Sequence, residues 1–218
     1  ALILFAAVPF TMGIQAGGDP APAAETVDVW DGETVTIGWY TEHQSDSSFT
    51  LSKASDLAGL AYLVAHRDYY IYYNASGKVD SPKEFYETSQ ADKKEAGLKE
   101  LKKGNDANST PILSFRGVSI KLDADLDLAG KPYTPVGTSA SFGGHFDGQN
   151  HTISNVYVTP ETALHTGPKG TGILDFGLFG SIAWGGSVSN LTIQNETLDA
   201  TGAGFENSSS TVNIGGVL

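Results

Sequence analysis

SFGGHFDGQNHTISNVYV, residues 141–158, mixes glycines, an Asp and Asn residues with apolar ones and ends in a short run of β-formers. Part of it recurs downstream. ISNVYV begins at Ile153, and VSNLTI, with the same apolar–Ser–Asn–apolar order, begins at Val188 at an offset of 35 residues. One tight turn would explain a single Gly–Asp pair but not a repeated motif, so the stretch predicts a repeat architecture.

Two further matches give similar spacings. In DFGLFG (175–180) and NIGGVL (213–218), Phe176 precedes Ile214 by 38 residues. SFGGHF is a weaker earlier copy, in which Phe142 precedes Phe176 by 34 residues. A period of 34–38 residues built from short strands and Gly turns is typical of stacked repeats.

The Ser–Asn pairs predict corners. Ile153 and Val156 have opposite parity, so they cannot both face inward on one straight strand, whereas a bend at Ser–Asn brings both inside. Asn tolerates the left-handed conformation that such a bend requires. Strands stacked ~4.8 Å apart would place Asn155 and Asn190 one above the other as a hydrogen-bonded ladder. Each unit therefore predicts one turn of a coiled parallel sheet.

Composition limits the class of protein. The 218 residues suffice for one sizeable core, and the absence of cysteine excludes disulfides and thiolate chemistry. The 26 glycines favour turn-rich β structure. A net charge of −12 argues against nucleic acid as a partner, because phosphates need cations opposite them.

The first third of the chain predicts an export signal followed by a small mixed region. Residues 1–24 have the apolar run and small-residue tail of a secretory signal peptide and linker, too short and too broken by Pro9 to span a membrane. Residues 25–66 predict opening strands and then a capping helix whose N-cap is Ser52. Its buried stripe is expected at Leu57, Leu60, Ala61 and Val64.

Residues 67–110 interrupt this pattern and predict a charged helical insertion that starts near Pro82 and ends near Gly104. Its tyrosines, Tyr70 and Tyr72 among them, could form an adhesive patch, or they could pack the insertion against the body.

Residues 111–218 predict the β-helix repeats, truncated at the C-terminal end. The segment 119–128 predicts a single strand with strict alternation. Its inward residues are expected to be Ile120, Leu122, Ala124, Leu126 and Leu128, and its outward ones include Asp123, Asp125 and Asp127.

Taken together, SFRGVSIKLDADLDLAGKPYTPVG, SFGGHFDGQNHTISNVYV and FGLFGSIAWGGSVSNLTIQN resemble the GLUG-type β-helix repeats of bacterial surface proteins. Such repeats occur in large adhesin-like proteins and beside the catalytic domain of immunoglobulin A metallopeptidases. The resemblance covers about residues 28–66 and 112–218, and the 67–110 insertion departs from it. The expected fold is therefore mainly β: a right-handed parallel β-helix (solenoid) with an N-terminal capping helix and a helical insertion.

The aspartates of the predicted strand are the best candidates for chemistry. Carboxylates two residues apart on one strand face lie roughly 6.5–7 Å apart, within the range of an inverting glycosidase pair. Alternating Asp is also typical of a solvated strand face. DADLDLAG, which starts at Asp123, places Asp as a calcium loop does but lacks the Gly and Glu of that loop, so calcium is only a weak expectation and no other cofactor or metal is indicated.

Three functional hypotheses follow. The first is a non-catalytic, exported module of the bacterial cell surface, serving adhesion or as a stalk, with a host or matrix glycan or protein as partner and no membrane span in the mature chain. The second is a polysaccharide-acting β-helix enzyme that uses the Asp123–Asp127 row or Asp147. The third is the accessory N-terminal region of a larger surface peptidase. The signal-like start, the acidic composition, the repeats and the absence of catalytic motifs such as HExxH favour the first hypothesis.

Overall fold

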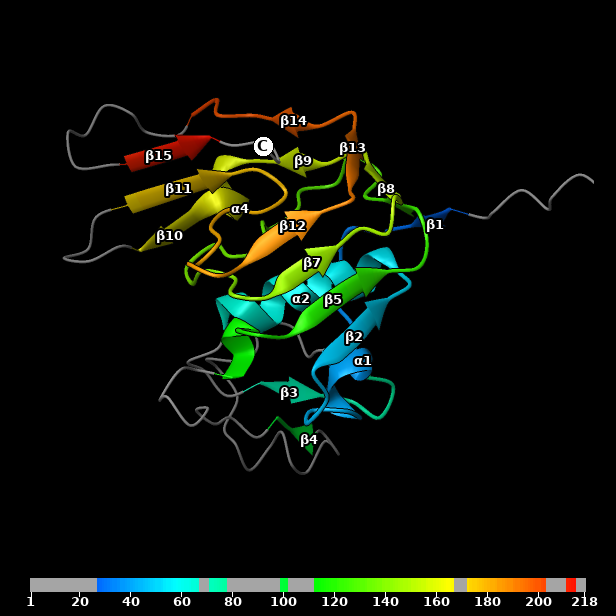
Figure 1. Cartoon of the computed structure of the whole chain (residues 1–218). Helices are drawn as coiled ribbons and strands as arrows, with labels where there is room; N and C mark the ends of the chain where they lie inside the picture. Colours follow the sequence, from blue (N-terminus) through cyan, green and yellow to red (C-terminus); the bar gives the residue numbers. More distant parts are fainter. Residues whose placement is uncertain are drawn as a thin grey trace, which may run out of the picture.

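The computed structural model describes residues 27–66, 71–77, 99–101, 112–166, 172–202 and 211–214. Short strands dominate, and most of them lie in small parallel sheets (Figure 1). Within these residues, no helix is both long and apolar enough to span a membrane. The helices are α1 (Gly38–Thr41), α2 (Ala54–Ala65), the 3-10 turn η1 (Ile112–Ser114) and α4 (Pro160–Ala163). The strands are β1 (Asp28–Val29), β2 (Ser48–Leu51), β3 (Tyr72–Tyr73), β4 (Lys99–Glu100), β5 (Ser119–Leu122), β6 (Leu126–Asp127), β7 (His145–Asp147), β8 (Thr152–Ser154), β9 (Tyr157–Val158), β10 (Leu164–Thr166), β11 (Gly172–Phe176), β12 (Ser187–Ser189), β13 (Thr192–Gln194), β14 (Thr197–Leu198) and β15 (Thr211–Ile214).

The chain visits the same sheets repeatedly and in the same order. We define three passes in the described residues: the first runs through β5 and β6, the second through β7, β8 and β9, and the third through β12, β13 and β14. One sheet has the order β2, β5, β7, β12, and a second has the order β1, β6, β8, β13. All of these pairs are parallel, and β9 pairs with β14 in the same sense. Each pass therefore lies beside the one before it (Figure 1).

The strand register corrects the offsets read from the sequence. Ile153 pairs with Ile193, 40 residues on, and Val188 pairs with Phe146 rather than with Ile153. The expected match of Phe142 with Phe176 is also wrong, since Phe142 bridges to Ile182. The 38-residue spacing is confirmed in β11 and β15, where Phe176 and Ile214 are parallel partners.

The reason is that a pass has two similar corners. In the third pass, Asn190 lies between β12 and β13, and Asn195 lies between β13 and β14. Both have a left-handed φ, 50° and 56°, as does Asn155 with 55°. The sequence comparison matched Asn155, at a second corner, with Asn190, at a first corner. The left-handed Asn conformation is thus confirmed, while the predicted contact between Asn155 and Asn190 is wrong.

The expected single strand over 119–128 is two strands in two sheets, β5 and β6. Of the five residues expected to point inward, four are buried, Ile120, Leu122, Leu126 and Leu128. The fifth, Ala124, lies in the corner between the two strands and is only half-buried. The spacing of the apolar residues could not reveal this corner, because the three residues between Leu122 and Leu126 keep the period of two across it.

Helix α2 begins at Ala54, with Lys53 rather than the predicted Ser52 as N-cap. Two carboxylates accept hydrogen bonds from its first backbone N–H groups: Asp56 Oδ2 from Lys53 at 3.1 Å, and Asp28 Oδ2 from Ala54 at 2.8 Å. Anions are favoured at a helix N-terminus, so β1 and α2 are fixed to one another there.

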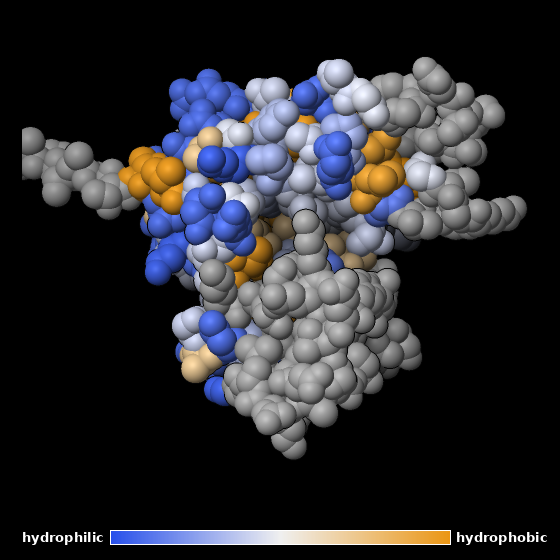
Figure 2. Space-filling view, turned by 180° about the vertical axis from the view of Figure 1, so that it is seen from behind, coloured by the Kyte–Doolittle hydropathy of each residue, from blue (hydrophilic) through white to orange (hydrophobic). Residues whose placement is uncertain are grey.

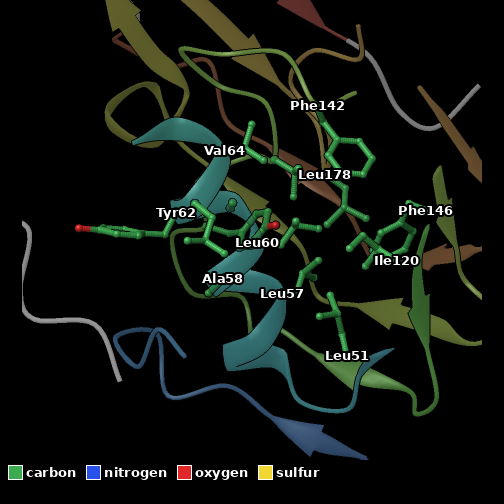
Figure 3. Close-up of a cluster of buried hydrophobic side chains, with 14 of the residues drawn as sticks. Leu51, Leu57, Ala58, Leu60, Tyr62, Val64, Ile120, Phe142, Phe146 and Leu178 are labelled. Atoms are coloured by element: carbon green, nitrogen blue, oxygen red, sulfur yellow. The ribbon is translucent and has the colours of Figure 1, made fainter. Parts of the chain in front are cut away.

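One face of α2 enters the hydrophobic core. The predicted stripe is buried at all four of its positions, Leu57, Leu60, Ala61 and Val64. Leu57 and Leu60 lie on the side of the helix that faces Ile120 (Figure 3). Tyr62 extends from the opposite side of the helix (Figure 3). Because Ala58 and Tyr62 are buried as well, α2 has buried residues outside the single stripe that the sequence indicated.

The remaining expectations for the first half are mixed. β1 and β2 match the short strands expected over 25–50, but the segment Gly38–Thr41 is helical, because Tyr40 turns inward to contact Phe49 and Phe115. The predicted signal segment 1–24 lies outside the described residues.

Within the 67–110 insertion, two segments are described, residues 71–77 and 99–101. The predicted helix from Pro82 to Gly104 lies outside them except at 99–101, where it is wrong: Lys99–Glu100 form strand β4, which pairs antiparallel with β3. Ile71 and Leu101 beside them are buried in the core, and Leu101 donates its backbone N–H to the Ile71 carbonyl at 2.8 Å. The insertion is thus anchored in the core at both described ends.

Candidate functional site

The three predicted aspartates do not share one face. Asp123 is exposed at the corner after β5. Asp125 Oδ1 accepts the backbone N–H of Thr152 at 2.8 Å and contacts His151 Nδ1 at 3.1 Å. These bonds tie the corner of the first pass to the second, so the paired-carboxylate geometry expected from one strand is wrong.

Asp127 has the same kind of role at the next corner. Its Oδ1 accepts the backbone N–H of Ala129 at 2.7 Å and the side-chain amide of Asn155 at 2.8 Å. Asn155 Oδ1 in turn accepts the Asn195 amide at 3.2 Å. A ladder therefore exists, but it runs through Asp127, Asn155 and Asn195 rather than from Asn155 to Asn190.

Asp147, the other carboxylate considered for catalysis, belongs to a second ladder. Its Oδ1 accepts the Asn190 amide at 2.9 Å and the Gln149 backbone N–H at 3.1 Å, and the Gln149 side chain contacts its other oxygen. The bond from Asn190 is the main reason that the pKa of Asp147 lies below its ordinary value. In the described residues, no three His, Cys, Asp or Glu side chains are grouped as a metal site would require.

Of the two predicted tyrosines, Tyr70 lies outside the described residues. The backbone of Tyr72 lies in β3, paired with Glu100 of β4. The structure therefore places Tyr72 at the base of the insertion, next to its buried anchor.

A pocket of about 540 Å³ lies beside α2, and we call it the helix pocket. Drug-sized and sugar-sized ligands occupy cavities of this size. The sequence analysis did not predict it. Its lining comes from the segment after β1, from α2, from the loop after β6 and from α4: Trp30, Gly32, Glu33, Val35, Ala58, Ala61, Tyr62, Ala65, His66, Pro132, Tyr133, Thr134 and Glu161.

The spacing of α2 explains why a pocket forms there. Ala58, Ala61, Tyr62 and Ala65 recur at i, i+3, i+4 and i+7, so they form a second stripe that adjoins the predicted one at Ala61. The alanines leave space, and Tyr62 extends beside it. This second stripe was visible in the sequence, but the leucine stripe alone satisfied the expectation of one buried face.

The opposite wall is aromatic. Trp30 and Tyr133 pack edge to face with ring centroids 6.1 Å apart, and Trp30 Nε1 donates to the Thr34 carbonyl at 2.8 Å. Tyr133 is fully buried, and its hydroxyl has no hydrogen-bond partner among the described residues. Burial holds the pKa of this phenol far above its ordinary value, so the hydroxyl stays protonated.

Two exposed carboxylates, Glu33 and Glu161, complete the lining. Hydrogen bonding from the Thr159 side chain holds the pKa of Glu161 below its ordinary value, so this group is ionised at neutral pH. Neither carboxylate forms an ion pair with a described residue. The pocket thus combines apolar and aromatic walls with uncompensated negative charge.

No protein-family model matches the chain, and neither a curated protein nor a solved structure does.

Proposed function

We propose that the chain is an exported, non-catalytic module of the bacterial cell surface whose stacked passes form a right-handed parallel β-helix serving adhesion or as a stalk. One observation carries the proposal: at successive corners, Asp125, Asp127 and Asp147 are hydrogen-bonded to the following pass. The carboxylates best placed for chemistry in the sequence thereby act as ties of a scaffold.

The fold part of the proposal rests on the repeated order of the sheets. Three passes meet the same two sheets in sequence, with Ile120 beside Phe146 and Phe146 beside Val188 in the interior row. A parallel crossover within one sheet is right-handed in nearly all proteins. The resemblance to GLUG-type repeats supports the same fold and supplies the expectation of export and surface attachment.

The experiment is a binding array of glycans and host-matrix proteins, probed with the full chain and with a variant in which residues 79–97 are replaced by a short Gly–Ser linker. Deleting all of 67–110 would remove Ile71 and Leu101 from the core, so the replacement keeps β3 and β4. Loss of binding in the variant would assign recognition to the replaced segment, and retention would assign it to the sheet faces.

The proposal fails if the full chain binds nothing on the array and hydrolyses a polysaccharide. Asp125→Asn distinguishes the two functions further. A scaffold role predicts lower stability with unchanged binding, whereas a catalytic role predicts loss of hydrolysis.

A further inference from the structure

We propose that the helix pocket binds a small organic ammonium ion: a protonated amine carried on an apolar body about the size of one ring. This goes beyond the proposed function, because the pocket could take such a ligand whether or not the chain is adhesive. The shape of the pocket and its charge each support it.

The walls specify the apolar body. Val35, Pro132 and the alanine stripe of α2 supply aliphatic surface, and Trp30, Tyr62 and Tyr133 supply aromatic surface. Aromatic rings attract cations as well as apolar groups, which favours an ammonium ion over a neutral ligand of the same shape. On the face seen in Figure 2, the described residues are mostly hydrophilic or intermediate, with separate hydrophobic patches.

The charges specify the sign of the ligand. Glu33 and Glu161 line the pocket without an ion-pair partner among the described residues. Among the described residues, no Lys or Arg belongs to the lining. Lys131 packs its aliphatic stem against Gly32, but it is not part of the lining. An anionic ligand would meet two carboxylates, whereas an ammonium group would neutralise them.

The test uses the full chain and three probes of nearly equal shape: 2-phenylethylamine, the neutral 2-phenylethanol and the anionic phenylacetate. Titration calorimetry and ligand-observed saturation-transfer NMR report binding. We expect the amine to bind at least fivefold more tightly than the alcohol and phenylacetate not to bind. Raising the salt concentration should weaken binding of the amine, because the carboxylates are exposed.

Variants assign the binding to the pocket. Glu33→Gln and Glu161→Gln should each weaken binding of the amine about two- to fivefold, the range for exposed charge pairs. Glu42→Gln, an exposed glutamate outside the lining, is the matched control and should change nothing. Ala65→Leu, which fills the pocket from the half-buried end of α2, should weaken binding more than tenfold while leaving the melting temperature nearly unchanged.

Three results would overturn the inference: equal binding of amine and alcohol, binding that Ala65→Leu leaves intact, or no binding of the amine at 10 mM, roughly the weak limit for a ring-sized ligand. Glucosamine is the fourth probe. If glucosamine binds more tightly than 2-phenylethylamine, the inference that the ligand has an apolar body is wrong. None of these outcomes bears on the array experiment, so failure here leaves the proposed surface function standing.

Discussion

At the scale of single residues, Gly59 is where another backbone segment packs directly against α2. A Cβ atom there would lie 1.9 Å from the carbonyl oxygen of Thr36. Thr36 cannot move away easily, since its N–H donates to the Ser55 carbonyl and its hydroxyl to Asp56 Oδ1. Gly59 therefore lets the segment after β1 pack directly on the helix.

We predict that Gly59→Ala destabilises the protein by about 1–3 kcal/mol, as overpacking does, although Ala is the better helix former by about 1 kcal/mol. Denaturant unfolding measures the difference. Gly38→Ala is the control: its Cβ would meet its nearest neighbour at 3.7 Å, so it should be nearly neutral. If Gly59→Ala were more stable than the parent protein, the segment after β1 would have to move and make room for the added Cβ atom.

Glu196 provides a prediction about pH. Its Oε1 is buried without a partner among the described residues, and burial raises the pKa of the carboxyl above the ordinary 4.5. Folding thus favours the protonated form, so this group's contribution to stability is complete at pH values below 4.5 and is lost as pH rises through the folded-state pKa.

Glu196→Gln should therefore raise the melting temperature at pH 7, and the gain should shrink toward pH 4. Glu161→Gln is the control of opposite sign, because the pKa of Glu161 is lowered and its ionised form is the favoured one. It should give no gain at pH 7. A gain for Glu196→Gln that is the same at both pH values would mean that ionisation is not its cause.

At the scale of elements, the corner ladders hold the passes together. Asn155 donates to Asp127 and accepts from Asn195, and its φ of 55° is one that Asp also tolerates. Asn155→Asp would keep the corner but replace the bond to Asp127 with two facing carboxylates.

We predict that Asn155→Asp costs about 1–2 kcal/mol at pH 7, from the lost bond and the charge repulsion, and that most of the cost disappears near pH 3. Thermal unfolding across pH measures it. Asn155→Gly keeps the left-handed corner without the amide, and its cost should not depend on pH. If both variants behave alike across pH, the ladder does not operate through charge.

Sequence patterns predicted some elements and missed others for identifiable reasons. The core face of α2 and the inward row from Ile120 to Leu128 depend only on local periodicity, and both are confirmed except at Ala124, which is only half-buried. The register failed because the second corner of one pass, at Asn155, and the first corner of the next, at Asn190, carry the same Ser–Asn motif. The helix pocket was missed because Trp30, Tyr133 and Glu161 are brought together by long-range packing, which no local pattern records.

At the scale of the whole molecule, the register decides which residues are neighbours. The structure pairs Ser154 with Gln194, whereas the 35-residue offset would pair Ser154 with Ser189. The chain has no cysteine, so engineered disulfides can test this without competing thiols.

We predict that the double variant Ser154→Cys with Gln194→Cys forms an intramolecular disulfide under mild oxidation and that Ser154→Cys with Ser189→Cys does not. Non-reducing electrophoresis and mass spectrometry detect the bond. Equal cross-linking of both pairs would reject the order of passes described above.

The corner ladders also have a direction. In four places the later Asn donates its amide to the earlier Asp or Asn: Asn155 to Asp127, Asn195 to Asn155, Asn190 to Asp147 and Asn213 to Asp175. A carboxylate can only accept, so an Asp can begin such a chain, while an Asn can accept and donate and so can extend it. Asp is therefore suited to the first position of a ladder, and Asn is suited to every later position. At the third pass, the side-chain amide oxygens of Asn190 and Asn195 accept no hydrogen bond from a described residue. A strand that joins this edge therefore extends the ladders if it brings a hydrogen-bond donor to these corners, and it is repelled if it brings a carboxylate.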